Sequence, residues 1–187
     1  MAKSSRPNEP PLPEALAYFL TWGTYGTWLP GDERGWSEYG HGWRPPDPIR
    51  KLEAEARMTE DACRLDDEQR DVVERQIAET CTIRGWKLHA VNCRTNHVHV
   101  VVTADVAPNV VRNQLKAWCT RRLKELEAKR QQARGETSSI RENWWAERGS
   151  QRFLNDEESL EAAIVYVRHR QDKPRAEADA DSHLPEA

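Results

Sequence analysis

Residues 88–103 constrain the fold of this chain more than any other stretch. They read LHAVNCRTNHVHVVVT, the pattern of two strands joined by a tight turn at residues 94–96. Because side chains alternate between the two faces of a strand, His97 and His99 fall on one face, while Val98 and the alternate valines after it face the core. The sequence therefore predicts a β-hairpin that holds two imidazoles side by side.

Two interpretations of this histidine pair are open at this point. Two neighbouring imidazoles can share one divalent metal ion. The same alternation is also typical of an amphipathic strand whose polar face is in water. The hairpin is compatible with both interpretations, so the rest of the chain has to decide between them.

A chain of 187 residues has the length of one domain. We predict that residues 14–173 form this domain. They lie between an N-terminal stretch rich in proline and charge, residues 1–13, and an acidic tail, residues 174–187, and we expect both ends to be disordered. The formal net charge is −3 at pH 7, so the charge of the whole chain gives no sign of a polyanionic partner, and local charge has to be considered instead.

The sequence also excludes several classes of protein. It has no run of the roughly 18 apolar residues that a membrane span needs, and its N-terminus lacks the apolar core of a secretory signal. We therefore expect a cytoplasmic protein without a membrane partner. The four cysteines form no CxxC pair, which argues against a structural zinc site, and we expect them to be reduced packing residues.

The apolar patterns outside the hairpin predict the other elements. The simplest packing of their order is an α+β fold, in which helices cover one face of an antiparallel, ferredoxin-like sheet. The predicted strands are residues 18–22, 86–93 and 97–103, with short extended pieces at 143–145 and 150–154, and the predicted helices are residues 66–84, 108–130 and 155–170.

Glycine and proline punctuate residues 23–46, which predicts a long loop. This loop carries three tryptophans, Trp28, Trp36 and Trp43. One interpretation is that their rings pack the loop back against the domain. The other is that some of them stack on unpaired nucleic-acid bases, which aromatic rings can do with little sequence preference.

The helix predicted at residues 108–130 concentrates positive charge in an otherwise acidic chain. A charge run on a helix is often only its solvated face. A local excess of this kind is also the electrostatic footprint that binds a phosphate backbone. The candidate DNA-binding residues are Arg112, Lys116, Arg121, Arg122 and Lys124.

Tyr166 lies off the apolar stripe of the last predicted helix, which Leu160, Ile164 and Val167 form. It could be a half-buried filler. A tyrosine hydroxyl is a poor nucleophile unless its electrophile is activated nearby, and a phosphodiester bound to a metal ion is such an electrophile. Two neutral imidazoles and one carboxamide or carboxylate oxygen suit Mn²⁺ or Mg²⁺.

Four stretches together resemble a known family. They are TYGTWLPGDERGW near the start, HVH preceded by asparagine, WWAERGSQRFLND, and AIVYVRHRQ in the last predicted helix. In this order they resemble the single-tyrosine HUH transposases, and more narrowly the insertion-sequence-200-like group that includes the REP-associated tyrosine transposases. The resemblance extends over about residues 15–173.

The resemblance implies a ferredoxin-like HUH endonuclease fold, usually a homodimer, that cuts and rejoins single-stranded DNA near imperfect hairpin ends. It implies that His97 and His99 bind a divalent metal, Mg²⁺ or Mn²⁺. It implies that Tyr166 is the nucleophile, which forms a 5′-phosphotyrosine and frees a 3′-hydroxyl. The protein would then be nucleoid-associated when bound to DNA.

The third metal ligand departs from the family pattern. Family members carry a glutamine or asparagine four residues after the tyrosine, where this chain has Arg170, and its glutamine is Gln171. Five residues along an ideal helix is a rotation of about 140°, so Gln171 can join Tyr166 at one metal only if the helix ends or bulges there. Pro174 favours such an ending. We expect Gln171 to be the third ligand, and the alternatives are His169 and Asp172.

The displaced glutamine leaves a second function open. A DNA-binding module of the same fold could recognise hairpins without cutting them, and would then bind DNA without metal. A domesticated copy that trims repeated palindromes for its host would share the chemistry of the transposases and differ in genomic context.

Overall fold

The computed structural model describes residues 15–38 and 40–169. The two ends for which we predicted disorder, residues 1–13 and 174–187, lie outside the described residues, as do Gln171 and Asp172. Within the described part, no helix is both long and apolar enough to cross a membrane. All four cysteines are buried, and none of them forms a disulfide with another.

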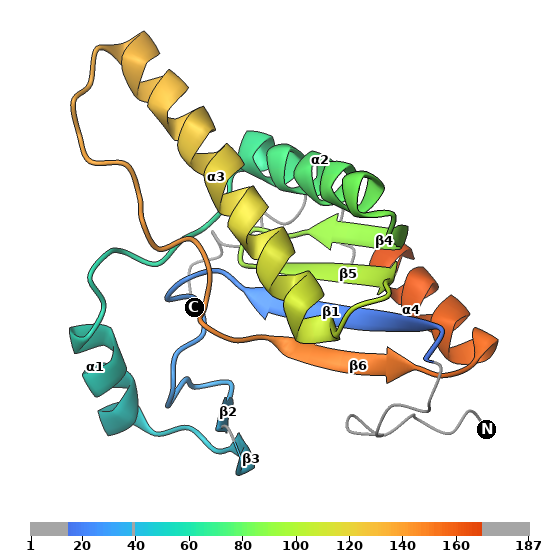
Figure 1. Ribbon diagram of the computed structural model, residues 1–187. Helices are drawn as coiled ribbons and strands as arrows, with labels where there is room; N and C mark the ends of the chain where they lie inside the picture. Colours follow the sequence, from blue (N-terminus) through green and yellow to red (C-terminus); the bar gives the residue numbers. More distant parts are fainter. Residues whose placement is uncertain (1–14, 39, 170–187) are drawn as a thin grey trace.

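A four-stranded antiparallel sheet forms the centre of the described chain (Figure 1). Its spatial order is β4-β5-β1-β6, whereas along the chain one helix that packs on the sheet lies between β1 and β4 and another lies between β5 and β6. This βαββαβ connection with interleaved strands is the ferredoxin-like arrangement, so the predicted fold class is confirmed. The strands are β1 (Ala17–Gly23), β4 (Lys87–Cys93), β5 (His97–Thr103) and β6 (Ser150–Leu154), and the connecting helices are α2 (Asp67–Arg84) and α3 (Pro108–Arg134).

Helices cover both faces of the sheet, although we expected them on one face. Helices α2 and α3 pack over the face that carries Leu20. The last helix, α4 (Glu157–His169), packs on the opposite face through Ala163 and Val167 (Figure 1). The physical reason is Val101, which lies on the histidine face of β5 and is fully buried there. An apolar patch on that face needs a cover, and α4 provides it.

Strand β4 contains a bulge. Leu88 pairs with Val102 and Ala90 pairs with Val101, so that His89 is an extra residue in the ladder. Leu88 therefore packs with the core beneath α2 and α3, while Ala90 belongs to the core beneath α4.

The ends of the long helices follow local signals. Asp66 forms a capping box at the start of α2, and Gly85, with a φ of 70°, ends this helix in the left-handed conformation. Helix α3 begins with Pro108 and continues to Arg134, four residues beyond the predicted end.

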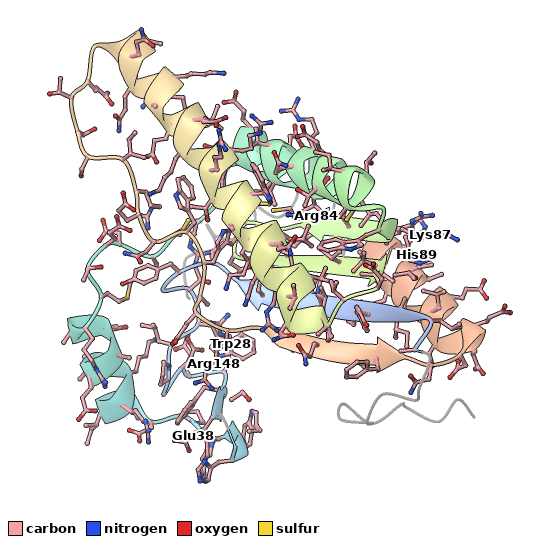
Figure 2. The ribbon with its side chains drawn as sticks, viewed as in Figure 1. Trp28, Glu38, Arg84, Lys87, His89 and Arg148 are labelled. Atoms are coloured by element: carbon pink, nitrogen blue, oxygen red, sulfur yellow. The ribbon has the colours of Figure 1, made fainter. Side chains whose placement is uncertain are left out.

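The predicted glycine-rich loop contains secondary structure that the sequence analysis missed. Strands β2 (Trp36–Glu38) and β3 (Gly42–Arg44) form a small antiparallel hairpin, and helix α1 (Pro48–Ala56) follows it. No residue of α1 is buried, and its N-terminal signal is Asp47, whose side chain accepts from the backbone nitrogen of Arg50. These elements lie outside the main sheet (Figure 1), and Figure 2 labels Trp28 and Glu38 among them. We call residues 24–58 the tryptophan extension.

Candidate active site

The two histidines of β5 lie on the face of the sheet that α4 covers. Their ring centroids are 4.7 Å apart. His97 is opposite Gly23 of β1 and is half-buried, whereas His99 is opposite Thr21 and is only 7% exposed. The alternation predicted for this strand is thus confirmed, because Val98, which lies between the histidines, points into the core on the other face.

A neighbouring side chain holds the Nδ1 atom of each imidazole. The Oδ1 atom of Asn96 lies 2.7 Å from Nδ1 of His97, and the Oγ1 atom of Thr21 lies 2.7 Å from Nδ1 of His99. Because an amide oxygen only accepts, Nδ1 of His97 carries the hydrogen, and in the neutral ring the lone pair is on Nε2. Contacts of this kind fix the tautomer and the orientation of histidines that bind metals.

Tyr166 joins the histidine pair from α4. Its ring centroid is 5.9 Å from that of His99, with the two rings nearly perpendicular. Phe19 of β1 completes the cluster, because its ring stacks on His99 at 5.5 Å and meets Tyr166 edge-on at 5.9 Å. Tyr166 remains 40% exposed. The structure therefore brings the predicted nucleophile and the predicted metal ligands to one partly open place.

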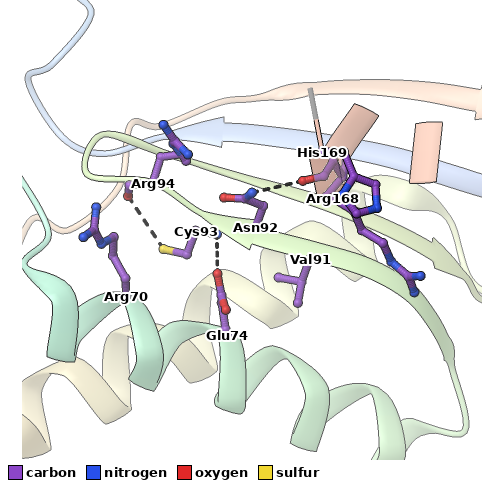
Figure 3. A pocket seen from close by; sticks show the side chains of 9 residues that line it. Arg70, Glu74, Val91, Asn92, Cys93, Arg94, Arg168 and His169 are labelled. Atoms are coloured by element: carbon purple, nitrogen blue, oxygen red, sulfur yellow. Dashed lines mark hydrogen bonds between the residues drawn. The ribbon is translucent and has the colours of Figure 1, made fainter. Parts of the chain in front are cut away.

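Asn92 connects the strands to the helix of Tyr166. It is the cross-strand partner of His99, and its Nδ2 atom donates to the backbone oxygen of Val167 at 3.0 Å (Figure 3). Arg168 adds a second connection, because its Nη2 atom donates to the backbone oxygen of His89 at 2.7 Å. Sequence reasoning missed Asn92. The pairing register of the hairpin, which the turn determines, places Asn92 opposite His99 and could have identified it.

A pocket of about 360 Å³ lies beside this connection, between α2 and the end of α4 (Figure 3). It is bordered by Asn92 and by the basic residues Arg70, Arg94, Arg168 and His169. The Oε1 atom of Glu74 accepts from the backbone nitrogen of Cys93 at 2.8 Å and closes the side toward α2. The pocket therefore adjoins the last turn of the helix that carries Tyr166.

The three candidates for the third metal ligand differ in what the structure describes. His169 is the last residue of α4 and is exposed at the pocket, while Gln171 and Asp172 lie outside the described residues. Among residues 15–38 and 40–169, no three histidine, cysteine or acidic side chains gather closely enough to hold a metal ion. The two imidazoles nevertheless fit a metal in their donor chemistry, because Asn96 and Thr21 hold them by their Nδ1 atoms.

The basic helix lies away from the histidine pair. Helix α3 covers the opposite face of the sheet. Lys116 donates from Nζ to the backbone oxygens of Ala146 at 2.6 Å and of Glu147 at 3.2 Å, and burial lowers the pKa of this lysine to about 8. Arg112 donates to the backbone oxygen of Gly149 at 3.2 Å. These two residues thus support the turn before β6.

The other three candidate DNA-binding residues form ion pairs on the surface of α3. Arg121 pairs with Glu125 at 3.1 Å, and Lys124 pairs with Glu142 at 2.5 Å. Arg122 pairs with Glu125 at 3.0 Å and with Glu79 at 3.4 Å. Most of the predicted positive charge therefore has an acidic neighbour within the chain.

A family model for IS200-like transposases matches residues 59–169, which is more than half of the chain and includes His97, His99 and Tyr166. No curated protein sequence matches the chain.

Two solved structures are similar to the chain at low identity. One is a REP-associated tyrosine transposase bound to a REP hairpin, with a TM-score of 0.46, 12% identity, and coverage of 89% of this chain and 70% of that chain. The other is a protein of Deinococcus radiodurans R1 provisionally assigned as a transposase, with a TM-score of 0.45, 17% identity, and coverage of 89% of this chain and 95% of that chain.

Proposed function

The chain belongs to the family of IS200-like transposases, and from this premise we propose that it cuts and rejoins single-stranded DNA with Tyr166 as its nucleophile. The observation that carries the proposal is the contact between Tyr166 and His99, at 5.9 Å between ring centroids, on the buried histidine face of β5. A filler tyrosine would serve packing alone. Tyr166 instead remains 40% exposed, so that a DNA strand can reach it.

In the proposed reaction, the Oη atom of Tyr166 attacks the scissile phosphorus, the bond from phosphorus to the 3′-oxygen breaks, and the leaving oxygen takes a proton to become a 3′-hydroxyl. The phenol proton passes to solvent or to a nearby base. The product is a 5′-phosphotyrosine, and attack by a 3′-hydroxyl reverses the step, so no nucleotide cofactor is consumed. A metal ion held by His97 and His99 would neutralise charge on a non-bridging phosphate oxygen.

The proposed metal is Mg²⁺ or Mn²⁺, with Gln171 as the third ligand and His169 or Asp172 as alternatives. The proposed partner is single-stranded DNA with hairpin ends, bound by a homodimer in the cytoplasm at the nucleoid. We keep Arg121, Arg122 and Lys124 as candidate contacts to the phosphates of a hairpin stem. For Arg112 and Lys116, support of the turn before β6 is the role that their hydrogen bonds favour.

The test is a search for the covalent adduct. The protein and Mn²⁺ are incubated with a pool of hairpin oligonucleotides whose unpaired flanks are randomised, labelled at the 3′ end in one sample and at the 5′ end in another. A 5′-phosphotyrosine retains the 3′ label on the protein in a denaturing gel and releases the 5′ label, and chelator suppresses both signals. If the pool yields no adduct, cleavage by this chain is refuted.

A second function has one sequence observation in its favour, the displacement of the glutamine to Gln171. A non-cleaving hairpin-binding protein of the same fold would bind the pool with a salt-dependent affinity. Its affinity would be the same with chelator and after His97→Ala. If the chain cleaves DNA, chelator and His97→Ala should each suppress the labelled adduct. The same experiment therefore separates the two functions.

We predict that Asn92→Ala slows adduct formation about five- to tenfold and leaves DNA affinity unchanged. The substitution removes the hydrogen bond to Val167, worth about 1 kcal/mol, and loosens the helix that positions Tyr166 against His99. Rates are measured under single-turnover conditions, and affinity by fluorescence anisotropy.

The matched control for Asn92 is Asn143→Ala, which removes an amide contact to Thr59 outside the site. Asn143→Ala should leave the rate of adduct formation unchanged. An Asn92→Ala protein that forms the adduct at the wild-type rate would remove Asn92 from the positioning of Tyr166.

A further inference from the structure

The tryptophan extension exposes two indole rings. Trp28 is 60% exposed and Trp43 is 68% exposed, whereas Trp36 between them in sequence is buried. Packing of the loop thus accounts for Trp36. It leaves most of the surface of the other two rings open.

Both exposed rings are held against Gly35. The Nε1 atom of Trp28 donates to the backbone oxygen of Gly35 at 2.8 Å. A Cβ atom added at Gly35 would lie only 2.6 Å from Nε1 of Trp43 and 2.7 Å from its Cε2 and Cζ2, so the Trp43 indole rests on this glycine. Gly35 has a φ of 79°, a conformation that other residues rarely adopt. The two rings therefore share a support that only glycine provides.

The buried carboxylate of Asp32 orients Arg34, which lies over the Trp28 ring. The guanidinium of Arg34 lies 5.4 Å from the centroid of the Trp28 ring and donates to Asp32 through Nε at 2.7 Å. This hydrogen bond lowers the pKa of Asp32 to about 2, so the carboxylate stays charged at neutral pH. Arg34 also donates to the backbone oxygen of Thr27 at 3.0 Å. The ring is thus oriented by several contacts before any ligand binds.

The start of the extension is attached beside His97. The backbone nitrogen of Thr24 donates to the backbone oxygen of Asn96 at 2.8 Å, and the hydroxyls of Thr24 and Thr27 contact the same oxygen. Asn96 in turn holds the His97 ring. Figure 2 shows the label of Trp28 far from that of His89, which marks the other end of the sheet. Trp28, the residue after Thr27, therefore lies toward the end of the sheet that carries His97.

The charges around the two rings are paired. Arg34 pairs with Asp32 at 2.7 Å, and Arg44, which follows Trp43, pairs with Glu38 at 2.8 Å. Glu38 also pairs with Arg50 at 3.0 Å, so these three arginines are engaged by carboxylates while the flat faces of the two rings stay exposed. Stacking of bases requires only such faces, whereas binding of a phosphate backbone would require unpaired cations.

We propose that Trp28 and Trp43 form a stacking platform for unpaired bases of the DNA strand that leads to the scissile phosphate. This inference rests on the proposed function. It adds a binding site in the tryptophan extension, which precedes the segment matched by the family model at residues 59–169. The occupant is single-stranded DNA, because the extension that carries both rings begins beside His97, at Thr24 and Thr27, and the chemistry of the rings is that of base stacking.

The test is the affinity for oligo(dT), measured by fluorescence anisotropy for Trp28→Ala, Trp43→Ala and the double variant. Stacking predicts a loss of about 5- to 150-fold per base removed from its ring. Affinity for a blunt hairpin without unpaired nucleotides stays unchanged. Because neither substitution removes a charge, the slope of affinity against salt concentration also stays that of the wild type.

Trp118→Ala is the matched control, because Trp118 is a 39% exposed tryptophan that also lies beside an arginine, but on α3. It should leave the affinity for oligo(dT) unchanged. Trp28→Phe and Trp43→Phe preserve an aromatic face and should recover most of the binding. Such recovery would show that the alanine variants lose affinity because the ring is missing and not because the protein misfolds. Circular dichroism confirms that each variant is folded.

Several results would overturn the platform. Unchanged affinity of the folded double variant for oligo(dT) would do so, as would equal losses for oligo(dT) and the blunt hairpin. A change of sedimentation in the double variant without a change in DNA affinity would instead assign these rings to contacts between copies of the chain. Affinity for oligo(dT) is measured without cleavage, so a wild type that shows tryptophan-dependent binding but no adduct refutes cleavage and leaves the platform standing.

Discussion

Tyr166→Phe will abolish the covalent protein–DNA adduct, with a loss of at least about a thousandfold, while DNA affinity stays at the wild-type level. The substitution removes only the nucleophilic hydroxyl. A phenylalanine keeps the edge-on ring contacts to Phe19 and His99, and the position is 40% exposed, so the fold should not change. The measurement is the 3′-labelled adduct in a denaturing gel beside an anisotropy titration.

Tyr18→Phe serves as the control, because Tyr18 is a tyrosine of β1 that packs against Phe153 outside the site. It should form the adduct at the wild-type rate. Peptide mapping of the wild-type adduct should find the nucleotide on Tyr166. Adduct formation by Tyr166→Phe at an undiminished rate would assign the nucleophile to another residue.

His97→Ala and His99→Ala should each reduce cleavage by at least about a hundredfold and weaken the binding of Mn²⁺. Each substitution removes one of the two imidazoles whose orientation Asn96 and Thr21 fix. Because His99 is buried and stacks on Phe19, its removal should also lower the free energy of unfolding, whereas removal of the half-buried His97 should change stability less. Calorimetry with Mn²⁺ and single-turnover cleavage provide the two measurements.

His89→Ala is the matched control for the histidine variants. His89 lies on the neighbouring strand at the far end of the sheet, where its Nε2 atom contacts Oγ1 of Thr103 at 2.9 Å, and burial lowers its pKa. Its loss should leave Mn²⁺ affinity and cleavage unchanged. Wild-type binding of Mn²⁺ by the double variant of His97 and His99 would show that the pair is a polar strand face and nothing more.

The parts of the fold that the sequence predicted are those that local chemistry determines. The alternation of β5 placed Val98 and His99 on opposite faces, and apolar residues at helical spacing predicted α2. Tyr166 stood out because it lies off the apolar stripe of its helix, although the next residue, Val167, belongs to that stripe and is buried. In each case the signal is within a few residues of the feature that it predicts.

The parts that the sequence did not predict depend on contacts between distant segments. Which face α4 covers is decided by the buried Val101, and the burial of a valine is not visible in its own strand pattern. The contact from Asn92 to Val167 joins residues 75 positions apart. In the same way, the two exposed tryptophans are distinguished from Trp36 only by tertiary packing.

The bulge in β4 lets one strand meet two incompatible demands. Leu88 has to reach the core under α2, and Asn92 has to face the helix of Tyr166, yet residues four apart in an unbroken strand lie on the same face. The extra residue His89 in the bulge places Leu88 and Asn92 on opposite faces. Without His89, Leu88 and Asn92 would be three residues apart, and an unbroken strand would then place them on opposite faces by itself. During divergence this strand could therefore lose one residue at the bulge and still keep both its pairing with His99 and its contact with the core.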